Sequence, residues 1–211
     1  MRSFVIAALA VAVALPAAAE EITQKSKDLN QLYKDAAVAQ HQLATDTKAI
    51  ADAHHCTTMI PPELKGRPRA EEKIRTDYNN DASRILDLAR ASIVCTKAAD
   101  VTATLAALKH KYGAGVVRVK DRFAKPVNGY RDIMTNVKMA NGHIVELQIH
   151  LKAILDVKGG VGHKLYEKIR SLVAKASDQK RELEDDEVEA IAAAEAQMKK
   201  AYDDAYAAAS K

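Results

Sequence analysis

Glu146, Gln148 and His150 have the residue types and the spacing of a chemically active strand face. They lie in the run VELQIH (residues 145–150), where each alternates with an apolar side chain. Because successive side chains of a strand point to opposite faces, one face would enter a core and the other would present an acid, an amide and an imidazole. Such groups can hold a metal or accept a proton. A solvated strand face without chemistry is the alternative.

A second carboxylate, Asp87, precedes the apolar run ARASIVC (residues 89–95), which predicts a buried strand. Helical spacing upstream places Asp87 at the end of a helix that leads into this strand. Two acids brought together from separate segments form a hard oxygen site, which suits Mg²⁺ bridging phosphate oxygens. Asp87 and Glu146 are therefore the candidate metal ligands.

Basic side chains gather in the middle of the chain. Residues 64–177 carry 22 basic and 11 acidic side chains, whereas residues 20–63 and 178–211 are both net acidic. Two clusters stand out: Lys65, Arg67, Arg69, Lys73 and Arg75, and then Arg118, Lys120, Arg122 and Lys125. This number of cations suffices to neutralise a triphosphate, and it predicts an anionic ligand such as a nucleotide or a nucleic acid. A basic surface balanced by acidic helices is the alternative.

Other catalytic motifs are missing from the sequence. It has no Walker-type glycine loop, CxxC pair, GxSxG elbow or HExxH helix, and the adjacent His54 and His55 lack the spacing of one helical face. Tyr130 follows Gly129 and offers a flat ring to a nucleobase, with a core aromatic as the alternative.

Apolar spacing and turn residues divide the chain into helices and strands. Helices are predicted at 22–55, 70–89, 100–112, 152–175 and 178–209, with an interruption at 79–81 that ends one helix and caps the next. Strands are predicted at 89–95 and 115–123, and a hairpin with an Asn-Gly turn spans 128–151. This order predicts an α+β domain, in which helices pack on a mixed β-sheet and helical extensions flank both ends.

The N-terminal segment has the pattern of a secretory signal peptide. Arg2 precedes an apolar run, and Ala17 to Ala19 form a cleavage signal. The run is shorter than the ~20 residues that span a membrane. We expect an exported protein, periplasmic or secreted after cleavage near Ala19, without stable membrane association; an N-terminal helix or an uncleaved anchor is the alternative. Cys56 and Cys95 are compatible with one disulfide or with two buried thiols.

Four segments, in this order, resemble the synthetase domain of the RelA/SpoT family, the pyrophosphokinases that make (p)ppGpp. They are LKGRPRAEEK (64–73), SRILDLARASIV (83–94), VKDRFAKPVNGYRDI (119–133) and GHIVELQIHLKAI with GVGHKLYEKIR (142–170). The resemblance implies a nucleotidyltransferase-like synthetase domain at 59–176. It would lie between a signal peptide with a helical extension (1–19 and 20–58) and a C-terminal helix (177–211).

The resemblance also implies roles for individual residues. Asp87 and Glu146 become the catalytic Mg²⁺ carboxylates, Tyr130 the ring that stacks on the acceptor guanine, and Gln148 a neighbour of the acceptor. The remaining nucleotide-binding candidates are Lys65, Arg69, Lys73, Arg90, Lys120, Arg122 and His163. The chain departs from the long synthetases after Gly-Tyr, where Arg131 to Met134 replace a Ser-Leu-His pattern and Met134 stands in place of a polar histidine.

The implied reaction transfers the β,γ-pyrophosphate of ATP to the 3′-hydroxyl of GDP or GTP. An export signal conflicts with this reaction, because ATP and GTP are scarce outside the cytoplasm. Three readings stay open: an exported effector or toxin that modifies an adenine nucleotide, a guanine nucleotide or an RNA 3′ end; a non-catalytic domain that binds a phosphorylated ligand or a partner; and a cytoplasmic enzyme. The oligomeric state is left open.

Overall fold

The computed structural model describes residues 21–210, and the predicted signal peptide at 1–19 lies outside them. Five strands form one sheet in the order β1-β2-β5-β4-β3. The strands are β1 (Thr57–Met59), β2 (Arg90–Cys95), β3 (Val116–Asp121), β4 (Ile133–Lys138) and β5 (Ile144–Leu151). β2 and β5 run parallel, and the other neighbouring strands are antiparallel. The predicted α+β class with a mixed sheet is confirmed.

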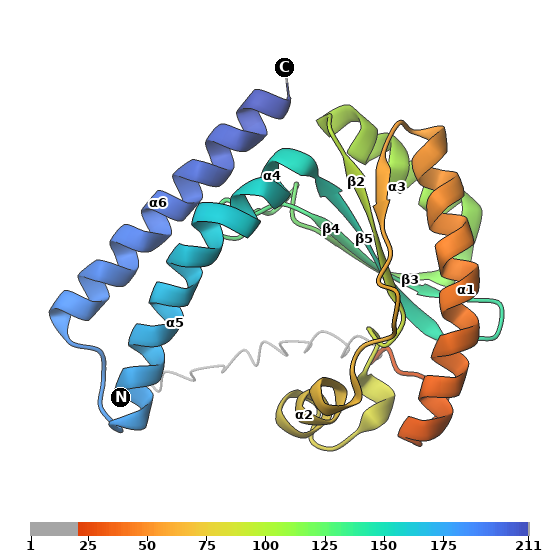
Figure 1. Ribbon diagram of the computed structural model, residues 1–211, viewed down its shortest axis with the longest axis horizontal. Coiled ribbons are helices and arrows are strands. Elements are labelled where there is room, and N and C mark those ends of the chain that lie inside the picture. Colours follow the sequence, from red (N-terminus) through yellow and green to blue (C-terminus); the bar gives the residue numbers. More distant parts are fainter. Residues whose placement is uncertain (1–20, 211) are drawn as a thin grey trace, which may run out of the picture.

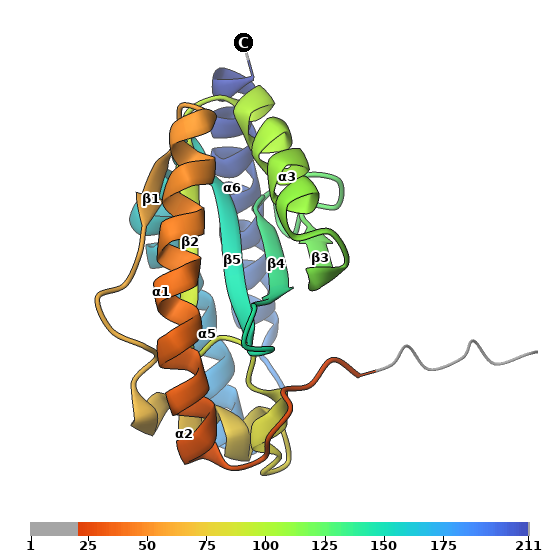
Figure 2. The same ribbon diagram turned by 90° about the vertical axis from the view of Figure 1, so that its right-hand side faces the viewer.

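Helices lie on both sides of the sheet (Figures 1 and 2). They are α1 (Leu29–Ala53), α2 (Arg67–Asp77), α3 (Ala98–Tyr112), α4 (Lys152–Val157), α5 (His163–Asp178) and α6 (Asp185–Ala209). α1 and α3 cover one face, whereas α5 and α6 form an antiparallel pair on the other side and leave much of that face open. No helix among residues 21–210 is long and apolar enough to cross a membrane.

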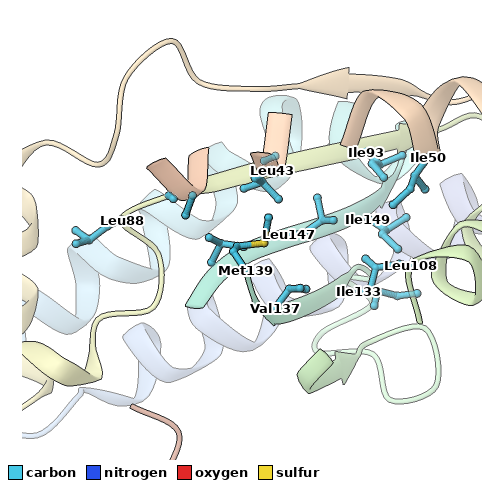
Figure 3. Close-up of a cluster of buried hydrophobic side chains, with 14 of the residues drawn as sticks. Leu43, Ile50, Leu88, Ile93, Leu108, Ile133, Val137, Met139, Leu147 and Ile149 are labelled. Carbon is cyan, nitrogen blue, oxygen red and sulfur yellow. The ribbon is translucent and has the colours of Figure 1, made fainter. Parts of the chain in front are cut away.

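The hydrophobic core lies between the sheet and α1 with α3. Apolar residues at helical spacing on α1, among them Leu32, Leu43 and Ile50, meet the inward side chains of the central strands (Figure 3). Leu147 and Ile149 of β5 are completely buried there. The period-two pattern of β5 thus places its apolar half in the core and its polar half on the open face, as predicted.

The helix predicted at 22–55 begins later, at Leu29. Residues 21–28 are held away from helical geometry by the buried side chain of Gln24, which exchanges hydrogen bonds of 2.9 and 2.8 Å with the backbone of Ile144. Asp28 then caps α1 by accepting a hydrogen bond from the backbone N–H of Asn30.

The helix predicted at 70–89 is also wrong in its second half. Asn79 and Asn80 both adopt positive φ angles (50° and 63°), which end α2. Asp81 caps only a single 3₁₀ turn (Ala82–Arg84), and the chain then runs extended, with the carbonyl of Leu88 accepting a 2.9 Å hydrogen bond from the Lys65 N–H. Asp87 therefore lies in an extended segment before β2, not at the end of a helix.

The edge strand β1 was not predicted. It has only three residues, too few to show a periodic pattern, and it pairs with β2 in antiparallel register. A disulfide between Cys56 and Cys95, with 4.4 Å between the Cα atoms, joins the two strands where they meet. Of the two alternatives, one disulfide or two buried thiols, the structure contains the disulfide.

The hairpin of β4 and β5 is confirmed, and Gly142 turns the chain with a φ of 81°. α4 and α5 follow, separated by a π-helical turn (Lys158–Gly162) at the predicted glycine break. The last helix begins at Asp185 rather than at Asp178, because α5 continues to Asp178 and a turn follows it. Glu184 and Glu187 form a capping box at the start of α6.

Candidate active site

Asp87 is a buried carboxylate held by two lysines. Its Oδ2 accepts hydrogen bonds from Lys65 Nζ at 2.7 Å and from Lys73 Nζ at 3.0 Å. Burial raises the pKa of Asp87, but the hydrogen bonds and charges of the two lysines outweigh burial and lower the pKa overall. Its Oδ1 is buried without a hydrogen-bond partner. The carboxylate is therefore ionised and has one oxygen available to a ligand.

Glu146, Gln148 and His150 form a hydrogen-bonded row along the open face of β5. Gln148 Nε2 donates to Glu146 Oε1 at 2.9 Å, and His150 Nε2 lies 2.9 Å from Gln148 Oε1. Because the Gln148 amide nitrogen donates, its oxygen must accept from His150, so the proton of the neutral imidazole lies on Nε2. The predicted common face of these three side chains is confirmed.

The segment that carries Asp87 lies beside Glu146. The Glu146 N–H donates to the carbonyl of Ala89 at 3.1 Å, and Arg90 is the register partner of Glu146 across the parallel pair β2–β5. Burial, followed by the nearby negative charge of Asp87, raises the pKa of Glu146. The charge of Asp87 thus acts on Glu146, and the pKa values of the two carboxylates shift in opposite directions.

Two hollows are lined by Glu146 and by the lysines that hold Asp87, respectively. One has a volume of about 420 Å³ and is lined by Glu146, Gln148, Arg90, Ala91 and Ser92, with Met59, Ile60 and Pro61 as an apolar wall at the end of β1. The other, of about 410 Å³, is lined mainly by α2 and includes Lys65, Arg69, Lys73 and, from α5, Arg170. The first offers an apolar surface beside the carboxylates, and the second offers positive charge suited to phosphates.

Four of the basic candidates lie near the carboxylates or line the basic hollow: Lys65, Arg69, Lys73 and Arg90. Lys65 is buried and Lys73 is partly buried, both on Asp87. Arg69 is exposed and pairs with Glu72 one turn away, and Arg90 is exposed beside Glu146.

The other two basic candidates, Lys120 and Arg122, lie in different environments. Lys120 is exposed on β3, where it faces Met134 in the sheet register. Arg122 forms an ion pair with the buried Asp132. Sequence reasoning gave Asp132 no role, because its long-range partners cannot be read from a local pattern. Arg122 is consequently engaged within the protein, whereas Lys120 is unengaged in the part of the chain that the structure describes.

Tyr130 and His163 meet at a separate pocket. It has a volume of about 390 Å³ and is lined mostly by apolar atoms from the loop before β4, the start of α5 and the helix α6. The Tyr130 hydroxyl donates to Asp132 at 3.0 Å, and burial, followed by the charge of Asp132, raises its pKa. Lys158, which lines this pocket, and Asp132, which accepts the Tyr130 hydrogen bond, both act electrostatically on His150.

Met134, the departure from the long synthetases, lies on the open face. It is the register partner of Gln148 on β5 and of Lys120 on β3. Across the sheet, the Met134 thioether thus lies between the Gln148 amide and the Lys120 ammonium. It offers neither of them a strong hydrogen bond.

The donor set fits Mg²⁺ only as a partial site. Residues 21–210 contain no group of three or more His, Cys, Asp or Glu side chains arranged around a metal. Mg²⁺, however, is commonly bound by one or two carboxylates together with substrate phosphates and water. Asp87 with its unpartnered Oδ1 and the adjacent Glu146 meet that requirement.

Comparisons with known proteins agree with this geometry. Residues 64–171 match the sequence model of a family described as the region found in RelA / SpoT proteins. The chain is also 28% identical, over 173 residues, to the (p)ppApp synthetase toxin Tas1 of Pseudomonas aeruginosa (strain UCBPP-PA14). That match covers 70% of this chain but only 38% of the toxin, so the chain spans less than two-fifths of this relative's length.

Solved structures share the fold. The Type VI effector Tas1, in the complex with its immunity protein, superposes with a TM-score of 0.64 at 25% identity, covering 88% of this chain and 100% of that chain. The small alarmone synthetase 1 from Bacillus subtilis, bound to its product pppGpp, gives a TM-score of 0.59 at 16% identity, covering 87% and 94%. The second likeness concerns the fold alone. Because the family model matches more than half of its length, the chain belongs to the RelA/SpoT family, whose synthetase region it carries at residues 64–171.

Proposed function

We propose that this protein is a nucleotide pyrophosphokinase, which transfers the β,γ-pyrophosphate of ATP to the 3′-hydroxyl of a purine nucleotide. The observation that carries the proposal is Asp87, which is held by Lys65 and Lys73 and has one unpartnered oxygen, in the segment that leads into β2 beside Glu146 of a RelA/SpoT fold. An ionised anchor and a proton acceptor side by side are what an in-line phosphoryl-group transfer to a hydroxyl requires.

The donor triphosphate is assigned to the basic hollow beside Asp87. Lys65 and Lys73 already hold a negative group there, and Arg69 lines the same hollow. Phosphate oxygens arriving at these cations would offset the cost of loosening their contacts with Asp87. The cations also stabilise the negative charge that builds on the departing AMP and on the pyrophosphoryl group.

Mg²⁺ is the cofactor that these residues would hold, on Asp87 Oδ1 and Glu146. When bound, the ion would neutralise charge on the ATP phosphates and orient them. Asp87 suits this role because the lysines keep it ionised, and its Oδ1 is buried without a hydrogen-bond partner.

Glu146 is assigned as the group that accepts the proton of the acceptor 3′-hydroxyl. Burial, followed by the charge of Asp87, raises the pKa of Glu146, which makes it the more readily protonated of the two carboxylates. The Gln148 amide occupies Glu146 Oε1 and so fixes the plane of the carboxylate. The 3′-oxygen then bonds to the β-phosphorus as the bond from that phosphorus to the bridging oxygen of AMP breaks, and AMP leaves.

The acceptor base is the finer question. The sequence resemblance predicts a guanine nucleotide, giving (p)ppGpp, whereas the 28% identity to a (p)ppApp synthetase favours an adenine nucleotide as the second candidate. Tyr130 offers a ring to either purine, so stacking alone does not discriminate between them.

Export of the enzyme remains part of the proposal. The Cys56–Cys95 disulfide is typical of proteins that fold in an oxidising compartment, which supports a periplasmic or secreted location. An exported pyrophosphokinase would meet nucleotides only after delivery into another cell, and the similarity to a Type VI effector supports that use. RNA 3′ ends are a further possible acceptor class on this reading.

The deciding experiment incubates the purified protein with γ-labelled ATP, Mg²⁺ and, separately, GDP, GTP, ADP, AMP and tRNA. We expect label transfer to at least one purine nucleotide and none without Mg²⁺. Tight nucleotide binding without transfer would instead favour the non-catalytic binding domain, and neither binding nor transfer would contradict the proposal altogether.

A further inference from the structure

Helix α6 lies outside the matched family region, yet it forms part of the pocket that holds Tyr130. Met198 and Tyr202 of α6 line this pocket opposite the loop before β4 and the start of α5. Both side chains are buried, at 8% and 4% exposure. The wall of this pocket is thus made partly by a segment that the family model, which ends at residue 171, does not include.

Two glycines show how closely α6 is fitted to the pocket. A Cβ atom on Gly129, which has a φ of 80°, would lie 2.7 Å from the carbonyl oxygen of Lys199 and 3.0 Å from Tyr202 Cβ. A Cβ on Gly162 would lie 2.7 Å from the Tyr202 hydroxyl. At Gly129 the Cβ would meet the backbone of α6, so α6 docks there only against glycine. At Gly162 the Cβ would also lie 2.9 Å from the carbonyl oxygen of Val157.

Arg131, the first residue of the segment that departs from the long synthetases, also contacts α6. Arg131 donates to Asp203 of α6 at 2.8 Å and lies 4.5 Å from the centre of the Tyr206 ring. The Arg131 side chain is only 13% exposed, whereas that of Asp203 is 35% exposed, so this ion pair is partly screened from water. Asn128 adds a 3.1 Å hydrogen bond to Glu195. The loop that carries Tyr130 is thus attached to α6 at both ends.

The chemistry of the pocket is that of a base-binding site. Its volume of about 390 Å³ and its largely apolar lining are typical of small-molecule pockets, and the polar groups in it are few. The Tyr202 ring meets the Tyr130 ring edge to face, with 5.5 Å between the centroids. The Lys158 ammonium lies 5.1 Å from the Tyr130 ring centre, so an exposed, flexible side chain covers the position where a flat base would stack.

We propose that α6 completes the acceptor site, with Met198 and Tyr202 forming the wall that determines how well the purine base of the acceptor fits. This inference rests on the proposed pyrophosphokinase function and adds specificity-determining residues to it. Met198 is the better position for a substitution, because its side chain lines the pocket. Tyr202 also packs against Gly129 and Gly162, so changing it would disturb the docking of α6.

The test compares two changes at one position. Met198→Ala removes a wall contact and Met198→Trp fills the pocket; each should raise the KM for the acceptor by about tenfold or more, with the KM for ATP within about twofold of its starting value. Val188→Ala is the matched control, since Val188 is an exposed residue of the same helix and is 49% exposed. It should leave both constants unchanged, and melting curves confirm that each variant is folded.

Direct titration with GDP and ADP, without a donor, separates this inference from the proposed function. Weaker binding of both nucleotides to the Met198 variants supports the wall even if the protein transfers no pyrophosphate. Unchanged or tighter acceptor binding in both variants would overturn the inference, even in a protein that transfers pyrophosphate efficiently.

Discussion

The two faces of strand β5 share one backbone but differ in the burial and polarity of their side chains. Val145, Leu147 and Ile149 are completely buried against the helices α1 and α3. Glu146 and Gln148, one residue away in each case, stand on the open face among hydrogen-bond partners and hollows. Alternation along one strand therefore builds the core with one set of side chains and the candidate active site with the other.

Unsatisfied polar atoms occur on both sides of the sheet. Among residues 21–210, three buried side-chain polar atoms have no hydrogen-bond partner, and Asp87 Oδ1 and His150 Nδ1 are two of them. A buried polar atom left unpaired costs about 1–3 kcal/mol. The third atom is Thr47 Oγ1 on α1, so the covered side carries such a cost as well. At Asp87 a ligand of the candidate site would supply the missing partner.

The largest expected effect is on the open face. Asp87→Asn should lower the rate of pyrophosphate transfer by about 100- to 1000-fold, because it removes the ionised anchor. It also leaves Lys65 without its anionic partner, so a modest loss of stability should accompany the loss of rate. Initial rates with γ-labelled ATP measure the loss of transfer rate. The control is Asp178→Asn, which changes an exposed carboxylate on α5. Full activity of the Asp87→Asn protein would remove this residue from the site.

The covered face should respond in the opposite way. Leu147→Ala should lower the free energy of unfolding by about 2–5 kcal/mol, because it leaves a cavity in a fully packed core. Transfer activity per folded molecule should change little. Urea unfolding followed by circular dichroism provides the measurement, and a specific loss of activity without a loss of stability would break the comparison between the faces.

The disulfide should contribute next to stability. Replacing Cys56 and Cys95 with serine opens a link between residues 39 apart, which should cost about 2–4 kcal/mol through the greater freedom of the unfolded chain. Thermal melting of the double variant and of the reduced protein should agree. Because Met59 lines the hollow beside Glu146 just after this link, ATP binding should also weaken; unchanged melting would show that the two cysteines do not pair.

A pH effect is the smallest of these. Burial lowers the pKa of His150 from 6.5 to about 4, so the folded protein favours the neutral imidazole. Its contribution to stability is complete above pH 6.5 and is lost as the pH falls toward 4, because the unfolded chain binds the proton first. Between pH 7 and 5 the loss should be roughly 2 kcal/mol. His150→Gln should reduce this loss, and the exposed His41→Gln should not; equal slopes in all three proteins would contradict the assignment.

Sequence patterns predicted what depends on local spacing. The alternation in VELQIH gave the two faces of β5 correctly, and the Asn-Gly turn gave the hairpin. The helical assignment of Asp87 failed because two left-handed asparagines end α2, and a three-residue strand such as β1 is too short to show a period.

Long-range pairing was out of reach of the sequence. Nothing local reveals that Arg122 pairs with Asp132, or that Arg131 reaches Asp203 across 72 positions. The same holds for α6, whose Ala-rich composition predicts a helix but not its contact with Tyr130. These pairings arise only when the fold brings distant segments together.

Glu146 offers the most direct test of the central claim, since it is the one carboxylate assigned both to the metal and to the acceptor proton. The decisive measurement is the single-turnover rate of pyrophosphate transfer by Glu146→Gln, beside Glu189→Gln as an exposed control on α6. The account predicts a loss of about 100- to 10,000-fold with unchanged melting and continued binding of the acceptor. A Glu146→Gln protein that transfers pyrophosphate at the unaltered rate with Mg²⁺ would contradict it.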